Sequence, residues 1–278
     1  MKHFSLLRRG LIACALAAHA PAASISLNPI ADAFVTSGSA DPNAGSPSEN
    51  YGAAGTLQVS APGSKEGEMQ SLMKFDFSTA KTLFDGTYGA GNWAVASIIL
   101  QLGTNFGTQG QQPNNAIFNK INAGLFKIDF LARNNWTEGT GTPANPTTNG
   151  VTFSGPSDSL STLESNADET LGTFTYTPVG NTGTVQPLTP PPASYSLSLD
   201  PTLAASFLAD VSSGSDVSLR AYAGDTGVSY LFNSREFGTA TNRPTLVVTA
   251  APEPGSAALL GSAALIWFAR RRCHARAA

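Results

Sequence analysis

Histidine and cysteine are nearly absent from this sequence. Its 278 residues contain three histidines and two cysteines, all near the chain ends: His3, Cys14, His19, Cys273 and His274. The stretch from Ser24 to Ala250 therefore has neither residue type. This excludes Ser-His-Asp and Cys-His nucleophilic catalysis, zinc sites built on histidine or cysteine, and disulfide bonds in that stretch. A domain of this length can bury enough apolar surface to fold without such cross-links.

Charged residues are also scarce, at 13% of the chain. Between Ser24 and Ala250 there are nine basic and 18 acidic residues, a net charge of −9. Nucleic acid is excluded as a partner because phosphate binding needs clustered lysine and arginine. A neutral polysaccharide, or an acidic one bridged by a divalent cation, is compatible with this charge.

The first 23 residues are predicted to be a secretory signal peptide. They combine a basic start, an apolar stretch over residues 10–18 and small residues over 20–23. Signal peptidase would cut after Ala22 or Ala23. Lipidation of Cys14 is the alternative, but only four residues separate Cys14 from Arg9, too few for an apolar region.

The last 27 residues form a three-part tail: Pro252, Glu253 and Pro254, an apolar run over 255–269, and the basic residues Arg270, Arg271 and Arg272. A helix over the apolar run would span about 22 Å, short of the roughly 30 Å hydrocarbon core, so we expect transient inner-membrane association. The arginines would stay cytoplasmic. An ordinary short tail anchor is the alternative.

This tail resembles the PEP-CTERM sorting signal of Gram-negative bacteria, and residues 252–254 match its Pro-Glu-Pro motif. The resemblance implies recognition by an exosortase and processing of residues 252–278. It also implies export through the inner membrane to the periplasm, the cell surface or the extracellular matrix.

Short strand-like segments separated by glycine- and proline-rich breaks fill residues 24–250. Strands are predicted at 31–36, 56–60, 72–77, 95–102, 126–130, 171–176, 195–199, 217–222, 228–232 and 245–249. One helix is predicted over 201–211, capped by Asp200 and burying Leu203, Phe207, Leu208 and Val211. Residues 103–115, 139–167 and 179–192 are predicted loops or insertions. This pattern indicates an all-β domain, a jelly-roll-like antiparallel β-sandwich.

Several short motifs in this domain together resemble the DNRLRE domain. They are Ala31-Asp32-Ala33, Asn50-Tyr51-Gly52, residues 72–78, Trp136-Thr137-Glu138, residues 232–236 and Arg243-Pro244-Thr245-Leu246. The region from 139 to 192 follows no pattern of that family. The resemblance implies a sandwich of the carbohydrate-binding-module type, often non-catalytic and in some members able to bind acidic polysaccharide.

Sugar binding needs aromatic faces and polar side chains for hydroxyl groups. Trp136, in a polar loop, and Tyr51 are the candidate rings; Trp93, Tyr222 and Tyr230 are further available rings. Lys74, Asp76, Lys127 and Asp129 are expected on the solvated face of a sheet as a polar floor. The alternatives are rings that fold over the core or support a turn, and ordinary alternating surface charge.

A structural Ca²⁺ ion is a further possibility at Asp32, Asn50, Asp76 and Glu236, which offer hard oxygen donors. The alternative for Glu236 and its neighbour Arg235 is an ion pair.

The function expected from these features is a non-catalytic, exported surface or biofilm-matrix protein that associates with extracellular polysaccharide. A purely structural matrix protein without a sugar site is the first alternative. A polysaccharide lyase or hydrolase is the second, using Asp76 with Asp129 or Tyr222 with Arg220.

Overall fold

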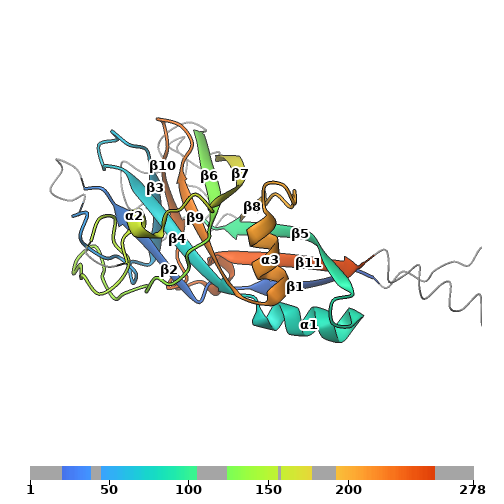
Figure 1. The fold of residues 1–278 in the computed structure, drawn as a ribbon. Helices are drawn as coiled ribbons and strands as arrows, with labels where there is room; N and C mark the ends of the chain where they lie inside the picture. Colours follow the sequence, from blue (N-terminus) through green and yellow to red (C-terminus); the bar gives the residue numbers. More distant parts are fainter. Residues whose placement is uncertain (1–20, 39–44, 105–123, 156–157, 177–191, 254–278) are drawn as a thin grey trace, which may run out of the picture.

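The computed structural model describes residues 21–38, 45–104, 124–155, 158–176 and 192–253. Within them the chain forms two antiparallel sheets with few helices (Figure 1). The predicted all-β sandwich is therefore confirmed. Most of the predicted signal peptide and of the tail, including Pro254 and the arginines 270–272, lie outside the described residues.

The smaller sheet has four strands in the order β1 (Ala23–Leu27), β11 (Thr245–Pro252), β5 (Trp93–Leu102) and β8 (Ala193–Ser196). Ala23 is paired with Ala250, so the domain begins and ends at the same edge of the molecule (Figure 1). Pro252 is the last residue of β11 and is paired with Trp93.

The larger sheet has seven strands. Its main order is β10 (Ser229–Asn233), β3 (Thr56–Ser60), β4 (Met69–Asp76), β9 (Asp216–Ala223), β6 (Gly124–Leu131) and β7 (Glu169–Tyr176), while β2 (Ala31–Thr36) pairs with β4. Alternation in β4 follows the prediction: Met73 and Phe75 point into the core, and Lys74 and Asp76 point to the other face.

The main core lies between the two sheets. Met73, Phe75 and Phe126 of the larger sheet share one apolar cluster with Leu100 and Val248 of the smaller one. Burial of these side chains is the principal stabilising contribution to a sandwich of this kind. In β5 only one face is fully covered, since Ile99 is half-exposed between two buried neighbours.

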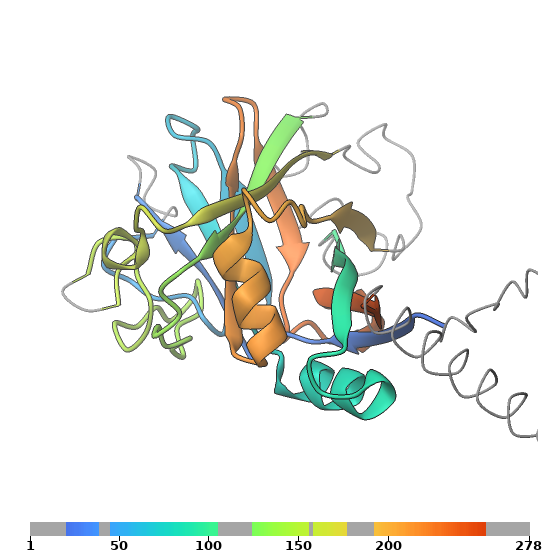
Figure 2. The same ribbon diagram turned by 45° about the vertical axis from the view of Figure 1, so that its right-hand side comes forward.

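Two helices, α1 (Ser78–Tyr88) and α3 (Ala205–Ser213), lie side by side at one edge (Figures 1 and 2). Helix α1 was not expected from the sequence. Helix α3 begins four residues later than predicted, because Asp200 starts a separate turn by accepting a hydrogen bond from the Thr202 N–H at 2.8 Å. Consequently Leu203, predicted to be buried, is 58% exposed.

The outer face of the larger sheet is only partly solvated, contrary to expectation. Residues 132–155 and 158–168 fold back over it as a covering segment that includes the short helix α2 (Leu160–Leu163). A second apolar cluster forms beneath this segment, from Leu72 and Leu131 of the sheet and Trp136, Val151 and Leu160 of the segment. Here loop residues contribute core side chains although their neighbours are polar.

In the part of the chain that the structure describes, none of the helices combines the length and apolarity needed to cross a bilayer.

Candidate functional site

A polar strip runs along the outer face of β6 and β9, beside the covering segment. Strand register places Asp129 opposite Arg220 and Lys127 opposite Tyr222. Directly paired residues of antiparallel strands share a face, so these four side chains are neighbours. Two of the predicted polar-floor residues, Lys127 and Asp129, therefore meet the Tyr222 and Arg220 pair considered for catalysis.

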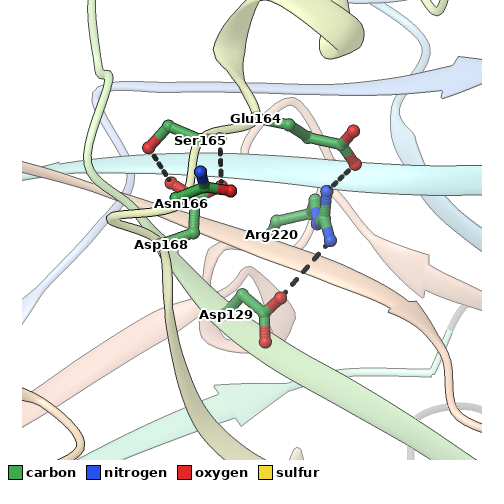
Figure 3. A pocket seen from close by; sticks show the side chains of 6 residues that line it. All are labelled: Asp129, Glu164, Ser165, Asn166, Asp168 and Arg220. Atoms are coloured by element: carbon green, nitrogen blue, oxygen red, sulfur yellow. Dashed lines mark hydrogen bonds and ion pairs between the residues drawn. The ribbon is translucent and has the colours of Figure 1, made fainter.

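An open pocket of about 370 Å³ lies at one end of this strip. Its lining residues are all polar: Asp129, Glu164, Ser165, Asn166, Asp168 and Arg220 (Figure 3). Such a lining suits a ligand with many hydroxyl groups, because carboxylates accept and guanidinium and amide groups donate hydrogen bonds.

Arg220 is the centre of the pocket. Its guanidinium lies between two carboxylates, 3.3 Å from Asp129 and in close contact with Glu164 (Figure 3). Asp129 and Arg220 are mostly buried, whereas Glu164 is half-exposed at the rim. Nε of Arg220 and Oδ1 of Asp129 have no hydrogen-bond partner among the described residues.

The pocket rim is a tight turn that follows α2. The Asp168 carboxylate accepts hydrogen bonds from the N–H groups of Ser165 and Ala132, each at 3.0 Å. Helix α2 itself begins with a reciprocal cap between Ser159 and Thr162. These bonds fix the backbone that presents Glu164 and Asn166 to the pocket.

Tyr222 is the one half-exposed ring among the five rings considered above. The Arg220 guanidinium carbon lies 4.4 Å from its ring centroid, and Nζ of Lys127 lies 5.9 Å from it. Burial, and then the nearby Asp129 carboxylate, raise the pKa of the Tyr222 hydroxyl. A tyrosine acting as a general base would need its pKa lowered rather than raised.

Trp136 does not form a sugar platform in this structure. The ring is 3% exposed, and its Nε1–H donates to the hydroxyl of Ser218 at 2.9 Å. Lys74 closes over it, with Nζ 4.7 Å from the ring centroid and bonded to the Trp136 carbonyl at 2.8 Å. Burial lowers the pKa of Lys74. Trp136 thus anchors the covering segment, and Lys74 is engaged beneath it.

Tyr51 is also buried. Its ring stacks on Phe34 with centroids 4.6 Å apart, and its hydroxyl donates to the Glu49 carboxylate at 2.7 Å. Trp93 and Tyr230 are buried in the main core. These rings are therefore not available for stacking on a sugar.

A second cluster of ionisable groups joins residues from distant parts of the chain. Carboxylate oxygens of Asp32, Glu138 and Glu236 lie within 4.8 Å of one another. Arg235 sits among them, with Nε 2.7 Å from both Glu138 and Glu236. The ion pairing considered as the alternative for Glu236 and Arg235 is present: Arg235 pairs both with Glu138 and with Glu236 itself.

Asp32 is the most buried member of this carboxylate cluster, at 1% exposure. Its Oδ2 accepts a hydrogen bond from the Arg235 backbone N–H at 2.7 Å, while its Oδ1 has no partner among the described residues. Burial, with the charges of Glu236 and Glu138, raises the pKa of Asp32 to about 8 despite the hydrogen bond from Arg235.

Asn50, predicted as a calcium ligand, instead organises the backbone around this cluster. Its Nδ2 donates to the carbonyls of Glu138 and Val151, at 2.7 and 2.8 Å. Its Oδ1 accepts from the N–H groups of Gly52 and Gly141, at 3.1 and 3.2 Å. The amide oxygen is fully engaged and is not free to bind an ion.

Asp76 lies apart from the carboxylate cluster. Asp32 pairs with Met73 and so shares the core-side face of the sheet, whereas Asp76 lies on the outer face. The Asp76 carboxylate accepts a hydrogen bond from Ser78 N–H at 2.7 Å, at the start of α1. Of the four predicted calcium ligands, only Asp32 and Glu236 are brought together.

Sequence reasoning did not identify Glu138 as a member of the carboxylate cluster, or Glu164, Ser165, Asn166 and Asp168 as pocket residues. The sequence did contain a signal for Glu138, since it belongs to the Trp136-Thr137-Glu138 motif. The rim residues stand in a segment without recognisable pattern, and only the fold shows that it returns to the sheet.

Comparison with models of protein families and with curated proteins gave no match to this chain.

Proposed function

We propose that this protein is an exported, non-catalytic surface or matrix protein that binds extracellular polysaccharide at the pocket around Arg220. The observation that carries the proposal is the wholly polar lining of an open pocket on a sheet face, next to the half-exposed ring of Tyr222. Sugars need this combination of hydroxyl-binding groups and a nearby ring.

The charge of the pocket favours a neutral polysaccharide. Asp129, Glu164 and Asp168 supply three carboxylates against one guanidinium, and Lys127 lies outside the lining. A bare acidic glycan would be repelled by this excess of negative charge. Hydroxyl groups of a neutral chain could still accept from Arg220 and donate to the carboxylates.

We also propose the two sorting signals, the jelly-roll-like strand arrangement and the kinship with the DNRLRE domain. The pairing of β1 with β11 supports this picture, because residues 1–22 and 253–278 attach at the same edge of the domain. Helix α2, which precedes the pocket rim, lies on the side of the molecule opposite to the start of β1 and the end of β11 (Figure 1). A membrane-held intermediate would therefore present the pocket outward.

Affinity-gel retardation of the full-length chain tests the sugar proposal. Gels containing neutral polysaccharides should retard the protein, and Glu164→Gln should weaken retention about tenfold, the effect of losing one hydrogen bond to a charged group. Glu68→Gln, outside the pocket, is the matched control. Retention equal to wild type in Glu164→Gln would refute the pocket as the site, and no retention on any glycan would favour the structural-matrix function.

The polysaccharide-lyase alternative rests on the adjacency of Tyr222, Arg220 and Lys127. The raised pKa of Tyr222 opposes it. Release of unsaturated products from a polysaccharide panel, lost in Tyr222→Phe, would replace the non-catalytic proposal.

Maturation in cells tests the sorting proposal. A triple alanine replacement of Pro252, Glu253 and Pro254 should stay membrane-associated and uncleaved, while Pro201→Ala in an exposed turn should mature normally. Normal processing of the triple variant would exclude an exosortase signal.

A further inference from the structure

The carboxylate cluster has the geometry of a hard-cation site. Ca²⁺ binds oxygen ligands at 2.3–2.6 Å, so two ligands on opposite sides of one ion are about 5 Å apart. Oxygens of Asp32, Glu138 and Glu236 within 4.8 Å of one another can therefore contact a single ion. All three donors are carboxylates, which favours calcium over softer metals.

A second observation points to a ligand, independently of the acidic composition. The Asp32 side chain is almost completely buried, at 1% exposure, yet its Oδ1 has no hydrogen-bond partner among the described residues. A buried, unpartnered carboxylate oxygen is costly, and a cation is one of the few groups that can satisfy it.

The charge balance of the cluster agrees. A bound cation would keep all three carboxylates ionised; with Arg235 as the counter-charge, the cluster would then carry a net charge of −2, which one divalent cation neutralises. The Nε atom of Arg235 forms ion pairs with Oε1 of Glu138 and with Oε1 of Glu236, and the Ser234 hydroxyl donates a hydrogen bond to Oε2 of Glu236 at 3.0 Å. Arg235 would therefore remain beside the ion and contact two of its ligands.

We infer that Asp32, Glu138 and Glu236 form a calcium site that ties together β2, the covering segment and the turn after β10. Asn50 supports it from outside by holding the Glu138 carbonyl, and Asp76 takes no part. The site is separate from the proposed sugar pocket and stands whether or not that pocket binds polysaccharide.

Thermal unfolding of the full-length chain tests this inference. After treatment with EDTA, about 5 mM Ca²⁺ should raise Tm by about 3–8 °C, from the affinities of extracellular calcium sites and the linkage of binding to stability. Mg²⁺, which demands a tighter octahedral geometry, should have a smaller effect. Excess EDTA should reverse the shift.

Glu138→Gln and Glu236→Gln keep the shape and the hydrogen-bond acceptor of each side chain but remove one negative charge. Each variant should need at least about ten times more Ca²⁺ than the wild type to reach the same rise in Tm, which corresponds to a loss of 1.4 kcal/mol in binding free energy. Glu68→Gln, outside both candidate sites, is the matched control and should respond to calcium as the wild type does.

Sensitised Tb³⁺ luminescence gives a second readout that does not depend on stability. We expect luminescence from the wild type that Ca²⁺ competes away, and a loss of this signal in Glu236→Gln. A Tm unaffected by Ca²⁺ would overturn the inference. A calcium response that persists unchanged in both glutamine variants would also overturn it.

Discussion

Asn50 should be among the most sensitive positions outside the main core. The residue is fully buried, and its side chain makes four hydrogen bonds to backbone groups of three separate segments. Each such bond contributes about 0.5–1.5 kcal/mol net, so Asn50→Ala should lower the free energy of unfolding by about 4 kcal/mol. For a domain of this size that corresponds to a fall in Tm of about 8–16 °C.

Asn50→Asp is the sharper variant because it changes no heavy-atom shape. The Nδ2 atom that donates to two carbonyls becomes an oxygen facing them at 2.7 and 2.8 Å. Two donors are lost, and a buried charge is placed against carbonyl oxygens. We therefore expect Asn50→Asp to be at least as destabilising as Asn50→Ala, although aspartate is the more conservative change in size.

Urea denaturation followed by tryptophan fluorescence measures these effects, with Trp136 as a buried reporter in the same segment. Asn149→Ala is the matched control, since Asn149 is exposed and, within the described part of the chain, its side chain bonds to Thr140 and Thr147 of its own loop. We expect it to cost less than about 1 kcal/mol. Losses below 1 kcal/mol in both Asn50 variants would refute the role assigned to this side chain.

Three further comparisons test the packing of the domain, each by urea denaturation. Trp136→Ala should cost about 3–5 kcal/mol by leaving a cavity under the covering segment, and unchanged stability would mean that the ring is not buried in solution. Gly141→Ala should destabilise, because its Cβ would lie 1.8 Å from a backbone oxygen, whereas Gly86→Ala in α1 meets nothing within 4 Å and should stabilise by about 0.5–1 kcal/mol. Asp129→Leu alone should cost about 1.5–3 kcal/mol, because the mostly buried Arg220 guanidinium loses one of its two carboxylate partners and keeps Glu164 at the rim. Adding Arg220→Met should recover most of that loss; a double variant as unstable as the sum of both single variants would contradict a buried ion pair.

The parts of the fold that could be predicted are the strands in which apolar and polar residues alternate along the chain. In β4, the alternation from Met73 to Asp76 predicts which side chains face the main core, and the structure agrees, whereas the burial of Leu72 on the outer face has no local signal. Helix α1 gives a weak signal because it buries only Ala80 and Phe84 along 11 residues. The start of α3 was misplaced because Asp200 and Pro201 are suited both to a helix cap and to the separate turn that they form.

The candidate sites were harder to predict because their residues meet only through the fold. The sequence separation between Asp32 and Glu138 is 106 residues, so no local spacing links them. Trp136 was a candidate sugar-binding ring because its neighbours are polar, with a ring folded over the core as the alternative. The structure shows the alternative, since the ring is 3% exposed. The opposite facing of Asp32 and Asp76 follows only from the register of β2 with β4.

The covering segment couples the two candidate sites. It carries Glu138 to the carboxylate cluster and Glu164 to the rim of the sugar pocket, and it is held to the sheet by Trp136 and by the bonds of Asn50. Loss of Trp136 or of the Asn50 hydrogen bonds should therefore weaken both sites together. Glu164→Gln should affect only the pocket around Arg220, and Glu236→Gln only the carboxylate cluster. From residue 139 onward the same segment follows no recognisable sequence pattern. A few anchoring residues, such as Trp136, would then hold the segment in place while the remaining positions stay free to set ligand specificity.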